Sequence, residues 1–213
     1  MKARKKILIT SGPTRAPLDA IRFLSNSSSG RFGTLLAREA LLRGAEVTFV
    51  YGRGSEFPRS HPRLKLVPIE THRDLVRRLR STLGQVHYDA IIHAMAVLDF
   101  EPASIRKGKV GSQVGEWRVR LVPTSKIIPK IRQWAPEAFL VGFKLEVGLT
   151  RTSLLQRARR LLRESGADLV VANQLGSGDD ERHLGYLLDH QGRLILKVRG
   201  KKGLSREIIR SVL

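Results

Sequence analysis

The stretch that decides the fold is residues 5–37, KKILITSGPTRAPLDAIRFLSNSSSGRFGTLLA. It begins with an apolar run at 7–9 and continues through two polar, glycine-containing loops, 11–14 and 25–30, before a helical pattern starts. Small residues let the backbone approach a ligand closely, and free N–H groups at a helix N-terminus bind anions. A strand followed by a polar loop and a helix start is where open α/β sheets bind nucleotides. The stretch therefore favours a nucleotide-binding α/β fold, while loops rich in Ser and Gly are also common as ordinary turns.

The composition is that of a globular protein with an unusual excess of positive charge. The chain has 213 residues, 41% of them hydrophobic and 27% charged, with no cysteine and a formal net charge of +20. This length allows a substantial core, and the lack of cysteine excludes disulfides and thiolate chemistry. The basic residues are spread along the chain, and aromatic residues suited to base stacking make up only 6%. We therefore attribute much of the charge to a solvated surface and do not expect nucleic acid as the partner.

The N-terminus starts with a basic segment, MKARKK, which is followed by a short apolar run. This run, residues 7–10, is too short for the apolar core of a signal peptide or for a membrane span. We therefore expect a cytoplasmic protein with no membrane partner.

Short apolar runs alternate with amphipathic stretches along the chain, which is typical of an α/β protein. The patterns predict strands at 7–10, 45–51, 64–68, 88–95, 117–122, 139–145, 168–172, 186–189 and 194–198. They predict helices at 31–43, from Thr71 as cap to about 83, at 126–134 and 152–165, and a last one capped by Ser205. The simplest account is one Rossmann-like domain over residues 1–213, with a mostly parallel sheet flanked by helices. A flap insertion at about 101–122 and a C-terminal β-hairpin complete it.

An NADP-dependent oxidoreductase is the main alternative that the residues leave open. The first loop lacks the pattern G-x-G-x-x-G, and the second expected strand ends in Tyr51-Gly52-Arg53 rather than in an acidic residue for an adenosine ribose. Arg53 could still contact a 2′-phosphate. A basic nucleic-acid-binding protein is a further alternative, suggested by the net charge alone.

Four motifs extend over nearly the whole chain. They are T-S-G-P-T at 10–14 with Asp19, Arg22 and S-N-x-S-S-G at 25–30; H-A-M-A-V-L-D-F at 93–100; the basic loop 106–109; and V-G-F-K at 141–144 followed by D-L-V-V-A-N at 168–173. In order and spacing the chain resembles phosphopantothenate–cysteine ligase, also called phosphopantothenoylcysteine synthetase. It looks closest to the monofunctional bacterial type, without a decarboxylase half in front.

The resemblance implies a ligase of coenzyme A biosynthesis that joins 4′-phosphopantothenate to L-cysteine with CTP, through an acyl-CMP intermediate and release of pyrophosphate. The residues leave CTP against ATP open. Mg²⁺ would accompany the triphosphate and be held by phosphates and water, so we name no metal ligands in the protein. The resemblance also implies a homodimer whose flap reaches toward the partner's site, and a separate decarboxylase that acts downstream. The strand expected at 117–122 is a candidate interface.

The same resemblance assigns the catalytic roles to Asn26, Lys107 and Ala96. Asn26 would hold the acyl intermediate, because an amide offers a donor and an acceptor without adding charge. Ala96 would lie against that intermediate. Lys107 would neutralise phosphoryl charge from the flap, and Lys109 is a rival for this role.

Other residues are implied to contact the nucleotide. Asp99 would lie near the base and ribose, Phe143 would pack on them, and Asn173 would close the site. Two lysines on a late helix of the family would grip the triphosphate. The first aligns with Arg160. The second aligns with Glu164, or with Arg163 if the alignment is shifted by one residue. We expect His93 to be a packed histidine that lines the pocket through its backbone rather than a base. The remaining contacts are Gly12, Thr14, Ser28, Ser29, Gly30, Ala94, Met95, Ser125, Lys126, Ile127 and Ile128.

Overall fold

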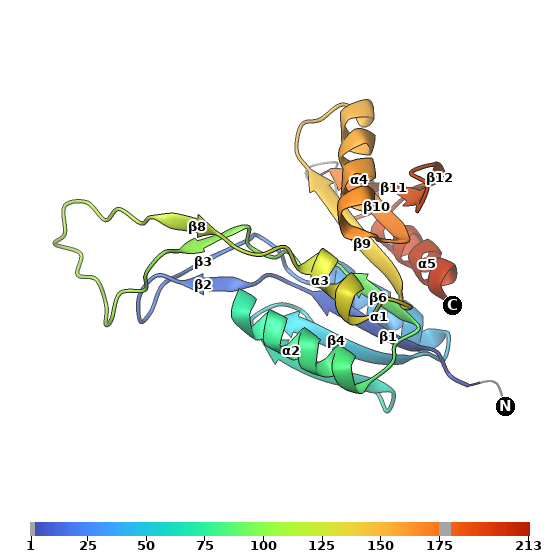
Figure 1. Cartoon of the computed structure of the whole chain (residues 1–213), viewed down its shortest axis with the longest axis horizontal. Helices are drawn as coiled ribbons and strands as arrows, with labels where there is room; N and C mark the ends of the chain where they lie inside the picture. The colour runs from blue at the N-terminus through green and yellow to red at the C-terminus, as the bar shows by residue number, and fades with distance from the viewer. Residues whose placement is uncertain (1–2, 175–179) are drawn as a thin grey trace.

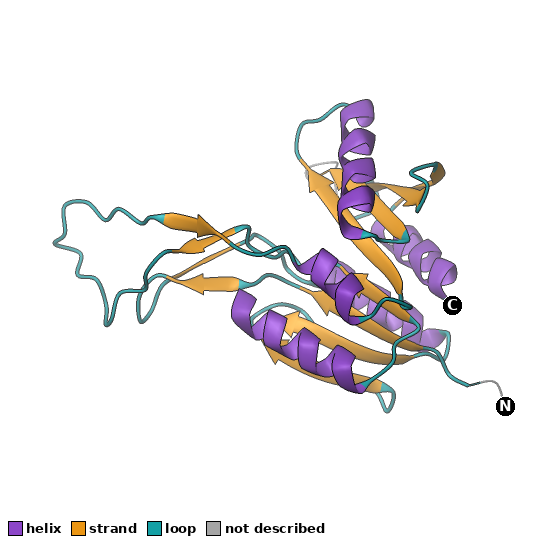
Figure 2. Cartoon of the chain, in the orientation of Figure 1, coloured by secondary structure: helices purple, strands orange, loops and turns teal. Residues whose placement is uncertain are grey.

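A computed structural model describes residues 3–174 and 180–213, and its centre is an eight-stranded sheet (Figure 1, Figure 2). The strands are β1 (Lys6–Ser11), β4 (Glu46–Gly52), β5 (Leu64–Ile69), β6 (Ala90–His93), β9 (Phe139–Glu146), β10 (Leu169–Gln174), β11 (Leu184–Asp189) and β12 (Leu194–Arg199). Their order across the sheet is β12-β11-β10-β9-β6-β1-β4-β5. The six strands β10, β9, β6, β1, β4 and β5 run parallel to one another. The strand β11 pairs antiparallel with both β10 and β12. The expected mostly parallel sheet with a C-terminal hairpin is confirmed.

Helices cover both faces of the sheet. On one face lie α1 (Arg31–Leu42) and α5 (Lys201–Val212), whose Leu36 and Ile208 are fully buried in one apolar cluster. On the other lie α2 (His72–Gln85), α3 (Ile127–Trp134) and α4 (Arg151–Ser165), packed in a second cluster. Full burial of one such side chain stabilises the fold by about 1.5–3 kcal/mol. Within the described residues, no helix combines the length and apolarity needed to cross a bilayer.

Two helix starts show where local sequence patterns succeed and fail. Thr71 caps α2 as predicted: its hydroxyl accepts the Asp74 N–H at 3.1 Å, while the Asp74 carboxylate accepts the Thr71 N–H. The prediction that Ser205 caps the last helix is wrong. The helix α5 begins at Lys201, directly after Gly200 with φ +82°, and Ser205 is buried inside it, donating to the Lys202 carbonyl.

The strand β6 covers only Ala90–His93, shorter than the expected 88–95, because residues 94–98 turn away to pair with the loop after β1. The strand β1 lies between β4 and β6. Its connection to β4 passes over one face through α1, and the connection into β6 passes over the other through α2. Chain connections therefore diverge at the carboxyl ends of β1 and β6, which is the ligand-binding position in doubly wound sheets.

Four short strands form an arm that projects from the sheet (Figure 1). The strand β2 (Arg15–Pro17) pairs with β3 (Phe23–Ser25), and β7 (Phe100–Pro102) pairs with β8 (Leu121–Pro123). The predicted strand at 117–122 is therefore wrong in its bounds: only Leu121–Pro123 has a strand opposite it. Residues 117–120 alternate in polarity but pair with no strand of the described residues. The Arg22 guanidinium lies over the Trp117 ring, 5.4 Å from the ring centre.

Candidate active site

Two loops at the carboxyl ends of β1 and β6 are joined by backbone hydrogen bonds. The Ala96 N–H donates to the Gly12 carbonyl at 2.9 Å, and the Thr14 N–H donates to the Ala96 carbonyl at 3.2 Å. The Leu98 N–H donates to the hydroxyl of Thr14 at 3.0 Å, and the Thr14 side chain is fully buried. Thr14 thus ties the two loops together, a structural use of the hydroxyl that was expected to contact phosphate.

Glycines let the polar loops pack against each other more closely than any other residue allows. Gly12 has φ +73°, and a Cβ there would lie 2.4 Å from the Ser55 Oγ. Gly30 has φ +80°, and its Cβ would lie 2.9 Å from the Glu56 carbonyl oxygen. The Ser11 hydroxyl donates to the Gly30 carbonyl at 3.0 Å. The loop after β1 and the start of α1 therefore form one tightly packed unit.

Asn26 lies on the exposed side of this unit and reaches across to the loop after β6. Its side-chain amide nitrogen donates to the Ala96 carbonyl at 3.1 Å, and its backbone carbonyl accepts the Ser28 N–H at 2.9 Å. At the neighbouring start of α1, Gly30 occupies the N-cap position and forms no side-chain capping bond. The arrangement brings the predicted residues Asn26, Ala96, Ser28 and Gly30 to one end of the sheet beside a helix N-terminus, where anions are favoured.

A cavity of about 180 Å³ opens beside these loops. The strand β6 contributes His93, and the segment after it contributes Met95 and Asp99; Phe143 of β9 forms another wall. The side chain of Phe143 also contacts Phe32 of α1 edge-on, with ring centres 5.8 Å apart. The segment entering α3 contributes further predicted residues, which are Ser125, Lys126, Ile127 and Ile128. The fold thus gathers residues that are more than 40 positions apart along the chain.

His93 stays neutral at this cavity. Its Nδ1 is hydrogen-bonded to the Thr10 hydroxyl at 2.8 Å, and burial lowers the pKa of the imidazole to about 4. A group with this pKa carries no charge near neutral pH. The arrangement agrees with the expectation of a packed histidine rather than a base.

The charged groups at the cavity mouth are held by exposed contacts. The Lys126 Nζ lies 2.6 Å from Asp99 Oδ1, and both side chains are about two-thirds exposed, at 69% and 64%. The Ser125 hydroxyl accepts a bond from Lys130 Nζ at 2.8 Å, and the Ser125 carbonyl is bonded to His72 Nε2 at 2.8 Å. An ion pair this exposed contributes about 0–1 kcal/mol to stability, so both charges stay available to a ligand.

The flap lysines lie away from the cavity within this chain. Lys107 and Lys109 are exposed on the arm, in the loop between β7 and β8. This loop is fixed to the residues between β2 and β3, because the buried Asp19 carboxylate accepts the Val110 N–H at 3.1 Å and the Arg22 guanidinium at 2.8 Å. Burial raises the pKa of Asp19, but these donors and the N–H groups of Ile21 and Arg22 together hold it below its ordinary value.

The expected arginines of α4 do not line the cavity. Arg160 pairs with Glu164 at 2.6 Å and is largely exposed, and Arg163 is exposed as well. The residue of α4 that lines the cavity is Leu161. Leu161 was missed in the sequence, because a leucine on an amphipathic helix looks like ordinary core.

Two further features of the site concern metals and a polar residue of β10. Within the described residues there is no cluster of three or more His, Asp or Glu side chains that could hold a metal ion. Asn173 lies near the end of β10, where its amide nitrogen is 3.2 Å from His183 Nε2. Its Oδ1 is buried and accepts no hydrogen bond from the described residues.

Thr124 was not predicted; its hydroxyl donates to the Leu98 carbonyl at 2.6 Å and fixes the cavity wall.

Comparison with known proteins shows the family to which the chain belongs. Residues 2–213 match the family described as "DNA/pantothenate metabolism flavoprotein C-terminal domain". The "Coenzyme A biosynthesis bifunctional protein CoaBC" of Thermococcus kodakarensis is 38% identical over 183 residues, 83% of this chain and 44% of that protein. The protein of the same name from Mycobacterium tuberculosis is 31% identical over 95% of this chain and 50% of its own length. The chain thus spans about half the length of these relatives.

Solved structures show the same fold. The "DNA/Pantothenate Metabolism Flavoprotein" of Streptococcus pneumoniae matches with a TM-score of 0.89 and 27% identity, over 99% of this chain and 98% of that one. The C-terminal domain of a CoaBC protein matches with a TM-score of 0.78 and 28% identity, over 98% and 93% of the two chains.

Proposed function

Because this chain belongs to the family of the DNA/pantothenate metabolism flavoprotein C-terminal domain, we propose that it joins 4′-phosphopantothenate to L-cysteine with CTP. The observation that carries the proposal is the bond from the Asn26 amide to the Ala96 carbonyl, 3.1 Å long. This bond supports the proposal because it joins the loop before α1, which carries Asn26, to the segment after β6, part of which lines the cavity. An acyl-nucleotide intermediate needs an uncharged donor and acceptor at the junction of an acyl site and a nucleotide site.

The first step activates the carboxylate of 4′-phosphopantothenate. A carboxylate oxygen attacks the α-phosphorus of CTP, the bond to the β-phosphate oxygen breaks, and pyrophosphate leaves. The protein's part is to position two anions and offset their charge. The start of α1, where the Ser29 hydroxyl accepts the Arg31 N–H at 3.3 Å, and the hydroxyl of Ser28 are suited to phosphate oxygens. Lys107 or Lys109 would supply a cation from the flap.

The second step forms the amide. The cysteine amine attacks the acyl carbon, the carbon–oxygen bond to CMP breaks, CMP leaves, and the amine proton passes to solvent. Asn26 would hold the acyl phosphate through this exchange, with Ala96 against it. His93 is neutral and bonded to Thr10, so we assign it no proton transfer.

The cavity would hold part of the nucleotide. Its volume of about 180 Å³ is below the ~300–1,000 Å³ of a whole ligand pocket, so it suits the base or ribose with the triphosphate outside. Phe143 would pack on that part, and Asp99 and Lys126 lie at the mouth. Mg²⁺ fits as a companion of the triphosphate held by phosphates and water, because the described residues offer no cluster of ligands for it.

A homodimer completes the proposed site. The arm exposes large apolar side chains, among them Ile21 at 60%, Phe100 at 53% and Ile105 at 58%. An apolar arm that projects from the sheet suits a partner copy, and the flap lysines would then reach the partner's cavity. The product would pass to a separate decarboxylase, which acts downstream in the proposed cytoplasmic pathway.

Ligand-induced thermal stabilisation distinguishes this function from the oxidoreductase alternative. We expect CTP with Mg²⁺ to raise the Tm, because a ligand that binds the folded state stabilises it by mass action. Under the same conditions NADPH should have no effect, and ATP with Mg²⁺ tests base preference. A shift with NADPH and none with either triphosphate would contradict the proposal.

A further inference from the structure

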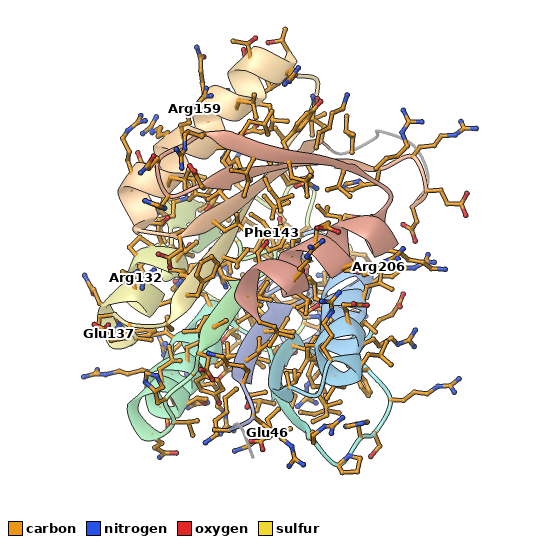
Figure 3. All side chains as sticks on the ribbon, turned by 90° about the vertical axis from the view of Figure 1, so that its right-hand side faces the viewer. Glu46, Arg132, Glu137, Phe143, Arg159 and Arg206 are labelled. Atoms are coloured by element: carbon orange, nitrogen blue, oxygen red, sulfur yellow. The ribbon has the colours of Figure 1, made fainter. Side chains whose placement is uncertain are left out.

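A second set of clefts lies at the amino ends of the sheet strands, opposite the proposed active site. One cleft, of about 710 Å³, is lined by Arg4, Lys6, Arg63 and Lys65, which come from the segments that begin or precede β1 and β5. Figure 3 faces this end of the molecule, where Glu46 at the start of β4 is labelled. The sequence spreads its positive charge along the chain, but the fold gathers part of it here.

A neighbouring cleft extends this basic surface. It has a volume of about 670 Å³ and shares Arg63 with the first. Arg38 and Arg59 line it, and Leu41 and Leu42 supply apolar surface. Since one residue lines both clefts, the two form a continuous basic surface that runs from β1 to α1.

The cations of this surface lack counter-charges. None of the six cations Arg4, Lys6, Arg38, Arg59, Arg63 and Lys65 has a carboxylate oxygen within 4.0 Å among the described residues. Among the described residues, Glu46 is the one carboxylate that lines either cleft. Some cations elsewhere are paired, as Arg193 is with Asp189 at 2.8 Å. Uncompensated positive charge in a cleft repels itself and attracts anions.

Arg63, at the junction of the clefts, has an unused donor. Its Nη2 donates to the Leu41 carbonyl at 3.1 Å, but its Nε is buried without a hydrogen-bond partner among the described residues. An unmet buried donor costs about 1–3 kcal/mol, more on a charged group. A phosphate oxygen at this junction would supply the acceptor that the protein does not provide.

The spacing suits an extended polyanion rather than a single phosphate. Lys6 aligns with Glu46 on β4, and Thr48 of β4 aligns with Lys65 on β5, so the lysines lie two strands apart. With the two-residue offset between Glu46 and Thr48, that separation is about 12 Å, more than the interval between successive charges of one nucleic-acid strand. In the first cleft, Tyr88 is the one aromatic residue among the described lining residues, and it is buried and bonded to the Thr48 hydroxyl at 2.9 Å, so it offers no face for base stacking. We propose that this basic surface binds the phosphate backbone of double-stranded nucleic acid without reading its sequence.

The test compares two triple variants of the full chain by fluorescence anisotropy with a duplex RNA or DNA of about 20 base pairs, between about 50 and 200 mM salt. Arg38→Ala, Arg59→Ala and Lys65→Ala together remove three cleft cations. The matched control is Lys197→Ala, Arg199→Ala and Lys202→Ala, which removes the same charge at the opposite edge of the sheet. Both variants should keep the wild-type far-UV circular dichroism and ligase activity.

We expect the cleft variant to bind duplex at least about tenfold more weakly than the control, with a salt slope shallower by about 2–3, since each lost phosphate contact removes about 0.9. Equal weakening by both variants would mean that diffuse charge alone binds and would overturn the proposal. So would a wild-type protein that shows no duplex binding at 50 mM salt, or one that binds phosphatidylserine vesicles in preference to duplex. Ligase activity is measured separately, so this result does not depend on the proposed function.

Discussion

The carboxyl and amino ends of the central sheet are built on different principles. At the carboxyl end, loops are held in register by backbone bonds, such as that from Ala96 to Gly12 at 2.9 Å, and a cavity of about 180 Å³ lies beside them. At the amino end, clefts of about 710 and 670 Å³ are lined by unpaired cations. The first end fixes the position of a few polar groups, whereas the second offers charge over a wide area. Substitutions at the two ends should therefore have different consequences.

The largest expected difference concerns Asn26 and Arg59. We expect Asn26→Ala to slow the cysteine-dependent step by about 100-fold or more, because it removes a donor from a developing charge. The step is measured by rapid quench after acyl-CMP has formed. Arg59→Ala, at the amino end, should leave this rate within about twofold of wild type. An unchanged rate in Asn26→Ala would remove Asn26 from the mechanism.

A pair of glycines tests how tightly each end is packed. Gly12 and Gly44 both have positive φ, +73° and +88°, but a Cβ at Gly44 would meet no atom within 4 Å. Gly44→Ala should therefore cost about 1 kcal/mol from backbone strain alone. Gly12→Ala adds a clash with Ser55 and should cost about 3 kcal/mol. Urea unfolding measures both, and equal costs would argue against close packing of the carboxyl-end loops.

The neutral His93 gives the carboxyl end a pH dependence. Its pKa is about 4 when folded and 6.5 in the unfolded reference. A depressed histidine pKa means that the unfolded state binds more protons, so the contribution is complete above pH 6.5 and is lost as pH falls toward 4. Between about pH 7 and 5 we expect a loss of about 2 kcal/mol. In His93→Gln this contribution to the pH dependence of the unfolding free energy should vanish. The pH dependence that remains would come from other groups such as His183, whose pKa burial also lowers.

The smallest expected effect concerns the exposed ion pair of Asp99 and Lys126. We expect Asp99→Asn to raise the KM for CTP about fivefold while changing stability by less than about 1 kcal/mol, because the pair is solvated. Glu46→Gln removes one carboxylate from the amino end and should leave the KM unchanged. The opposite pattern, with Glu46→Gln raising the KM, would place the nucleotide at the wrong end of the sheet.

The regular elements were predictable because periodicity and caps act locally. The apolar strands and the helix cap at Thr71 were predicted for this reason. The strands of the arm are three residues long, which is too short for an alternating pattern of apolar and polar residues to identify them. The alternation at 117–122 indicated a strand, but among the described residues only Leu121–Pro123 has a strand partner. The position and length of a short strand depend on the segment with which it pairs, and the local sequence does not show which segment that is.

The sequence motifs named residues that the fold brings near one end of the sheet, but they did not show the contacts that these residues make. The motifs identified Asn26, Ala96 and Phe143, and the fold brings the first two to 3.1 Å. No local pattern shows that the Thr14 hydroxyl would be used between loops, or that Leu161 would form a cavity wall in place of Arg160. Such contacts depend on which side chains meet across layers. The roles of all these site residues, and those of Lys107, Lys109 and Arg163, stay predictions.

The most direct test of the account is pyrophosphate release followed by trapping with cysteine. We expect release only when CTP, Mg²⁺ and 4′-phosphopantothenate are all present, and addition of L-cysteine should then yield CMP and 4′-phosphopantothenoylcysteine in equal amounts. Variants at the amino end should behave as wild type does. Pyrophosphate release that does not require 4′-phosphopantothenate, or no release with any nucleoside triphosphate, would contradict the assignment of the carboxyl end as a ligase site.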